Sequence, residues 1–87
     1  MSTQEQRDRF AELLEKVAAN QVSSSDALQQ TKQWIDIPWS EPTINSAYHH
    51  LQHFHIDSDV RERIPRYAEM QRKWLQVWAE RLRRNES

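Results

Sequence analysis

The sequence predicts an all-α fold, a small bundle of about four helices in a single domain over residues 1–87. Three observations indicate this. The chain contains no glycine, and it is rich in strong helix formers such as Gln, Glu, Arg, Ala and Leu. Its apolar residues recur three and four positions apart, the spacing that places side chains on one face of a helix. A chain of 87 residues can form one modest core, and 37% of its residues are hydrophobic.

The first helix is predicted over residues 3–20. Its apolar stripe repeats at helical spacing and consists of Phe10, Leu13, Leu14 and Val17. On the solvated side, Glu12 and Lys16 are one helical turn apart, so their opposite charges attract each other. Asn20 can take the left-handed conformation that glycine usually adopts after a helix, and we expect the helix to end there.

The second helix is predicted over residues 24–36, and the residues before it carry a start signal. Ser23 is followed by Asp26 at the spacing of a capping box, with Asp in place of Glu. The acidic side chain also suits the positive end of the helix dipole. Because Pro38 disfavours helical geometry in the residue before it, the helix should end near Asp36.

The third helix is predicted over residues 41–55, after a proline-rich linker. Ser40 is the expected N-cap, because Pro42 then lies in the first turn, where its missing amide proton costs nothing. In this register Trp39 and Ile44 occupy the positions of a hydrophobic staple. Trp39 therefore has two competing interpretations, a structural contact at the helix start and a contact with a partner.

A short helical turn over residues 59–64 and a long helix over residues 65–84 complete the predicted bundle. Pro65 separates them because proline inside a helix costs about 3 kcal/mol; a single kinked helix is the alternative. The final helix has a wide apolar arc of roughly 160°. Its members are Tyr67, Met70, Trp74, Leu75, Val77, Trp78 and Leu82. We expect this arc to pack against two neighbours, or against its own fold on one side and a second chain on the other.

The composition excludes several kinds of chemistry. Without glycine, phosphate-binding loops, the dinucleotide-binding turn and the nucleophile elbow are excluded in their usual forms. Without cysteine, disulfides, thiolate zinc sites and cysteine nucleophiles are excluded as well. We expect no cofactor and no enzymatic activity, because nothing in the nearest catalytic candidate, residues 55–59, fixes a geometry.

Neither the hydropathy nor the charge of the chain predicts a membrane or nucleic-acid partner. No apolar run could span a membrane and no signal peptide is recognisable, so we expect a cytoplasmic protein. Residues 1–56 carry four basic and seven acidic side chains, whereas residues 57–87 carry eight and six. Along the final helix the two signs alternate, as in Glu80 and Arg84, which disfavours nucleic acid as a partner.

Histidines cluster in the third helix, and they are His49, His50, His53 and His55. His49 and His53 lie one turn apart and are the candidate metal ligands. A complete site needs three or four ligands, yet the neighbouring outward positions carry no carboxylate. A solvated polar face that is rich in histidine is the competing and favoured interpretation.

The predicted function is binding to a protein. Trp and Arg are enriched at binding hot spots, and this short chain has four tryptophans. The predicted contact residues are Trp39, Tyr67, Met70, Trp74, Trp78 and Arg81. The sequence thus predicts an adaptor, regulator or inhibitor that uses the aromatic face of its final helix to bind another protein, or a second copy of itself as a dimer. A nucleic-acid-binding helical regulator and a His-rich metal-binding protein are the alternatives.

Overall fold

The computed structural model describes residues 3–34, 37 and 39–84 of the chain. This part of the chain forms helices and no strand, which confirms the predicted all-α bundle. The helices are α1 (Thr3–Ala18), α2 (Ser24–Lys32), α3 (Pro42–Ile56), α4 (Ser58–Arg63) and α5 (Pro65–Arg83). The short predicted turn is thus a separate helix, α4. None of the described helices is long and apolar enough to cross a membrane.

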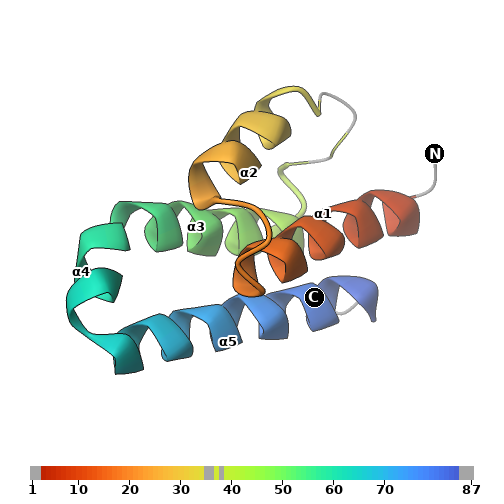
Figure 1. Ribbon diagram of the computed structural model, residues 1–87. Coiled ribbons are helices and arrows are strands. Elements are labelled where there is room, and N and C mark those ends of the chain that lie inside the picture. The colour runs from red at the N-terminus through yellow and green to blue at the C-terminus, as the bar shows by residue number, and fades with distance from the viewer. Residues whose placement is uncertain (1–2, 35–36, 38, 85–87) are drawn as a thin grey trace.

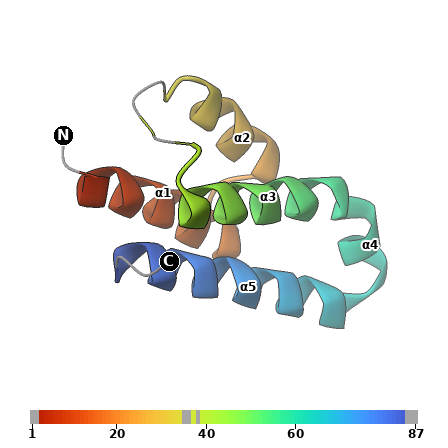
Figure 2. The same cartoon turned by 180° about the vertical axis from the view of Figure 1, so that it is seen from behind.

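Helices α3 and α5 run along each other in opposite directions and are joined at one end by α4 (Figure 1). Helix α1 packs along α5, also antiparallel to it, and α2 covers α3 on the side away from α5 (Figure 2). Helix α5 therefore has α1, α3 and α4 as neighbours. Helix α5 as a whole thus has more than one neighbour, as in the first of the two arrangements expected for its arc, and the second arrangement, with another chain, stays a prediction.

Helix α1 ends in a Schellman motif around Asn20. Asn20 has a φ of 62°, the left-handed conformation predicted for it. The amide of Gln21 donates to the carbonyl of Lys16 at 2.9 Å, and that of Asn20 to the carbonyl of Val17 at 3.0 Å. These are the two hydrogen bonds of the motif. They end the helix at Ala18 and not at residue 20.

Helix α2 begins as predicted and ends earlier. The Ser23 side chain accepts a hydrogen bond from the Asp26 amide at 3.1 Å, which confirms Ser23 as the N-cap. The helix ends at Lys32, where residue 36 was predicted. Near its end, the Thr31 hydroxyl donates to the Leu28 carbonyl at 2.6 Å. The final bonds run to carbonyls three residues back, which tightens and closes the last turn. The predicted last turn also included Ile35 and Asp36, which lie outside the described residues.

The N-cap of α3 is Glu41, so the predicted cap, Ser40, is wrong. One carboxylate oxygen of Glu41 accepts the amide of Ile44 at 2.8 Å, and the other accepts a hydrogen bond from Arg7 at 2.9 Å. An ion pair with α1 thus draws Glu41 into the cap position. The shifted register also removes Trp39 and Ile44 from the staple positions predicted for them.

A break at Ile64 separates α4 from α5, so the alternative of one kinked helix is wrong. Ile64 is extended, with φ −126° and ψ 95°, and Pro65 occupies the first turn of α5. A residue that precedes proline avoids helical geometry because its backbone clashes with the proline ring. The chain therefore turns sharply between α4 and α5, which brings α5 back along α3.

The core is one cluster formed mainly by α1, α3 and α5. Its largest fully buried side chains are Phe10, Leu14, Ile44, Leu51, Leu75 and Leu82. The buried stripe of α5 consists of Ala68, Leu75, Ala79 and Leu82. Only Leu75 and Leu82 belong to the apolar arc predicted for this helix. The remainder of the arc lies at the edge of the core or beyond it.

Arg7 ties both ends of the described chain to the start of α3. It is only 2% exposed. Its guanidinium group donates to the carbonyls of Leu82 at 3.1 Å and Arg81 at 3.3 Å, and it pairs with Glu41 at 2.9 Å. These carbonyls belong to the last turn of α5, which has no helical donors for them. Arg7 thus caps one helix and holds the N-cap of another.

Candidate binding groove

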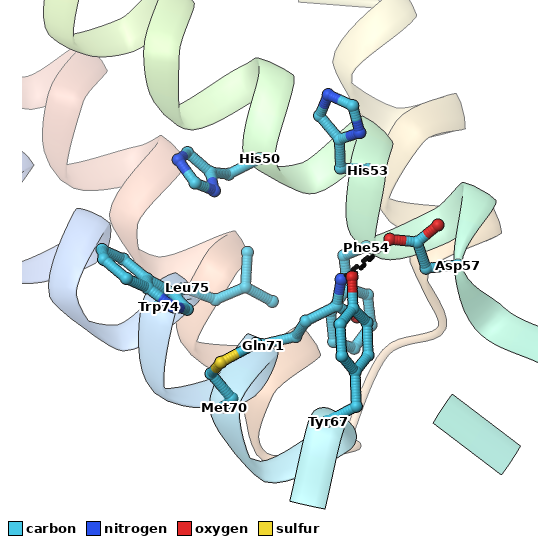
Figure 3. Close-up of a pocket in the computed structure, with 9 residues that line it drawn as sticks. All are labelled: His50, His53, Phe54, Asp57, Tyr67, Met70, Gln71, Trp74 and Leu75. Atoms are coloured by element: carbon cyan, nitrogen blue, oxygen red, sulfur yellow. Dashed lines mark hydrogen bonds between the residues drawn. The ribbon is translucent and has the colours of Figure 1, made fainter. Parts of the chain in front are cut away.

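The side chains of α3 and α5 leave a groove between them, which we call the α3–α5 groove. It has a volume of about 220 Å³. Its lining residues, drawn in Figure 3, are His50, His53, Phe54, Asp57, Tyr67, Met70, Gln71, Trp74 and Leu75. The break at Ile64 creates this groove, because it folds α5 back against α3.

An imidazole stacked on an indole forms one wall of the groove. The rings of His50 and Trp74 are nearly parallel, with centroids 5.9 Å apart, and His50 also contacts Trp78 at 5.2 Å. Burial lowers the pKa of His50, and the charges of His53 and His49 lower it further. The neutral imidazole is therefore favoured, and its flat face supports the Trp74 ring.

A hydrogen-bond network around Asp57 fixes the end of the groove near α4. One carboxylate oxygen accepts from the Tyr67 hydroxyl at 2.9 Å and from the Gln71 amide at 3.2 Å. The hydrogen bond to Asp57 raises the pKa of Tyr67. Arg61 donates to the Gln71 side chain at 3.0 Å, and its guanidinium carbon lies 3.5 Å from the ring centroid of Phe54. The Tyr67 ring is thus held in place as a wall.

The rim of the groove on α5 is exposed and apolar. Met70 and Trp74 are 48% and 47% exposed, although each is large and hydrophobic. They are one turn apart on α5, so they form a continuous ridge. A folded chain is stabilised by about 25 cal/mol for each Å² of apolar surface that it buries. The exposed surface of Met70 and Trp74 does not contribute to this stabilisation.

Beside this ridge, Trp78 is half-buried and carries Arg81 on its face. The guanidinium carbon of Arg81 lies 4.9 Å from the Trp78 ring centroid, within range of a cation–π interaction. The indole Nε1 of Trp78 is buried and has no hydrogen-bond partner among the described residues. Five of the predicted contact residues thus lie on α5, at or beside the groove: Tyr67, Met70, Trp74, Trp78 and Arg81.

Trp39, the remaining predicted contact residue, lies elsewhere. Its ring packs against Phe10 at 5.5 Å and Tyr48 at 5.0 Å, and its Nε1 donates to the Trp34 carbonyl at 3.2 Å. It lines a different hollow, between α2 and α3. These contacts are those of a residue that supports the core, although not through the predicted staple with Ile44.

The candidate metal ligands lie on two sides of α3. His53 lines the α3–α5 groove, whereas His49 lines the hollow beside Trp39. In the part of the chain that the structure describes, no three His, Cys, Asp or Glu side chains gather as a metal site would require. His55 is held by Ser24, with the Nδ1 and hydroxyl atoms 3.0 Å apart.

The groove residues Phe54, on α3, and Asp57, directly after it, were missed from the sequence, as was the stacking role of His50. The signal for His50 was present as an unusual histidine cluster, but it pointed to metal ligation.

Comparisons of the chain with protein-family models, curated proteins and solved structures give no match. The geometry of the groove therefore carries the functional argument.

Proposed function

We propose that this chain is a small protein–protein interaction module of the adaptor, regulator or inhibitor type. It binds a protein partner through the aromatic face of α5. The observation that carries the proposal is the exposure of Met70 and Trp74, 48% and 47%, on the rim of the α3–α5 groove.

The groove has the features of a binding hot spot. Hot spots are enriched in Trp, Tyr and Arg, and they pair a projecting anchor with a neighbouring recess. Trp74 supplies the projecting anchor and the groove of about 220 Å³ supplies the recess. Tyr67 forms a wall of the recess, and Trp78 and Arg81 support the ridge from the side.

Preorganisation is a second feature that supports the proposal. The Trp74 ring rests on His50, and Tyr67 is fixed by Asp57. Ordering a free side chain at an interface costs about 0.5–1.5 kcal/mol. Because these two rings are already ordered, their contacts with a partner lose less free energy to ordering.

The test is capture of partners from an extract of the source organism with immobilised protein. We expect Trp74→Ala to lose the captured partner, because truncation of a hot-spot tryptophan weakens binding by about 2 kcal/mol or more. Ile56→Ala is the matched control, since Ile56 is 68% exposed but does not line the groove. Circular dichroism of both variants checks that helicity is unchanged. Equal capture by the wild type and Trp74→Ala would overturn the proposal.

A further inference from the structure

Three cations border the exposed ridge of α5. Arg66, Lys73 and Arg81 are all exposed. At 100° per residue, they lie within about 100° of Trp74 around the helix axis. The acids of the same helix, Glu69 and Glu80, lie roughly 120–140° from Trp74 and thus farther round.

These cations are not neutralised by the fold. None of the three forms an ion pair with an acid among residues 3–34, 37 and 39–84. By contrast, Arg83 pairs with Glu15 at 2.6 Å, and Arg84 pairs with Glu80. The acid in the groove, Asp57, lies at the α4 end, where Tyr67 and Gln71 donate to it, and it is not part of the exposed ridge. The rim of the groove is therefore positively charged.

This charge disfavours a second copy of the chain as the occupant. The exposed large hydrophobics of the described residues are Ile56, Ile64, Met70 and Trp74, all near α4 and α5. A symmetric self-contact that buries them uses the same patch on both copies. Such a contact would bring the cations of one ridge against those of the other, and like charges across an interface are costly.

The exposed apolar surface is also too small for an obligate dimer. Trp74 is 47% exposed, so its accessible surface is on the order of 100 Å². A stable interface buries about 800 Å² on each partner. The ridge therefore suits a few anchor residues of a partner, with polar contacts around them.

The architecture favours a helical partner. In the described residues there is no strand, so no sheet edge can accept an extended peptide. The groove runs between two antiparallel helices, and its lining combines apolar and aromatic side chains with the polar side chains of Asp57 and Gln71 and two histidines. This is the arrangement in which an amphipathic helix inserts its apolar face.

We propose that the α3–α5 groove binds an amphipathic helix of a different protein, whose apolar anchor packs on Met70 and Trp74 and whose acidic side chains pair with Arg66, Lys73 and Arg81. This inference rests on the proposed function and adds the chemistry of the partner. Nucleic acid is the poorer match, because the exposed side chains of Met70 and Trp74 give the ridge an apolar character.

The test is selection from a random 16-residue peptide library displayed on phage, with counter-selection on Trp74→Ser. We expect the enriched peptides to carry an apolar anchor flanked by Asp or Glu. Their affinity for Trp74→Ser should fall at least about tenfold. The full-length protein serves as bait, and mass by light scattering and retention of a 20-nucleotide single strand of DNA are measured in parallel.

Charge variants test the cations directly. The double substitution Arg66→Glu and Lys73→Glu should weaken binding of an acidic peptide by about tenfold, chiefly through slower association, and should reduce its salt dependence. Lys32→Glu is the matched control, because Lys32 is exposed on α2, away from the groove. It should change the affinity by less than about twofold.

The outcomes separate this inference from the proposed function. The partner chemistry would be overturned if the peptides whose binding depends on Trp74 carried no acidic residues. It would also be overturned by a dimer that Trp74→Ser abolishes. Either outcome would leave the proposed interaction module intact. DNA retained in a Trp74-dependent way would overturn both in favour of nucleic acid. If no peptide and no self-association depends on Trp74, both proposals fail.

Discussion

Arg7 is a charged side chain that is almost fully enclosed by the fold. Burying a charge is costly unless each polar atom finds a partner. Arg7 meets this condition with two carbonyls of α5 and the Glu41 carboxylate. Arginine suits such a position because its fork of N–H groups reaches several acceptors at once.

Removal of Arg7 should therefore be strongly destabilising. We expect Arg7→Met to lower the free energy of unfolding by about 3 kcal/mol, because Glu41 and the last carbonyls of α5 lose their partner. Urea denaturation followed by circular dichroism measures this loss. Arg83→Met is the control, since its pair with Glu15 is exposed and should contribute less than about 1 kcal/mol. Similar losses for the two variants would argue against the capping role of Arg7.

His50 gives the stability a pH dependence. Its pKa is lowered in the folded chain, chiefly by burial. Above the ordinary value of about 6.5 the ring is neutral in both states. As the pH falls below that value, the unfolded chain binds a proton first, so the folded state loses stability until the folded His50 also titrates.

We therefore expect a shallower pH dependence for His50→Gln between pH 7 and pH 5. The measurement is the urea midpoint as a function of pH, and the ring resonances of His50 followed by NMR give the pKa itself. His55→Gln is the control, because His55 is exposed and lies outside the groove. An unchanged slope in His50→Gln would contradict the assignment.

At the scale of the element, the helix boundaries depend on both local and distant contacts. Asn20 and Ser23 act through bonds to near neighbours, so the sequence predicts both correctly. The cap of α3 moves from Ser40 to Glu41 because Arg7, on another helix, pairs with Glu41. A local pattern cannot contain such a contact, and the prediction failed there for that reason.

The Asn20 cap provides a matched pair of substitutions. We expect Asn20→Ala to destabilise the protein by about 1 kcal/mol, because a Cβ without a polar group disfavours the left-handed conformation. Asn20→Gly should be neutral or stabilising, since glycine adopts this conformation without strain. Thermal unfolding of the two variants measures the difference. If both variants shift the melting temperature equally, the conformation of residue 20 does not limit stability.

The buried stripe of α5 shows what periodicity leaves out. Ala68 and Ala79 are buried because small side chains let α5 approach its neighbours closely. The predicted arc did not include them, since alanine contributes little to an apolar pattern. Met70 and Trp74 dominated that pattern and yet lie at the surface. Hydrophobicity alone thus did not predict which side of α5 is buried.

At the scale of the molecule, composition and periodicity were sufficient for the fold class. The absence of glycine and the helical spacing of apolar residues are properties of the whole chain, and they predicted the all-α bundle. The groove depends on how α3 and α5 pack after the break at Ile64, so only its α5 half was predicted. Its positive rim likewise depends on the fold, because some cations pair with acids while Arg66, Lys73 and Arg81 form no ion pair within the described part of the chain.

The contacts of Gln4 and Arg7 have a further consequence for the topology of the chain. The Gln4 side-chain amide donates to the carbonyls of Leu82 and Arg83 at 3.2 and 3.1 Å, so the start of α1 lies beside the end of α5. A short peptide linker could close the backbone into a circle at this corner. Because the groove is lined by residues next to α4, such a closure would restrict the unfolded chain and leave the groove accessible.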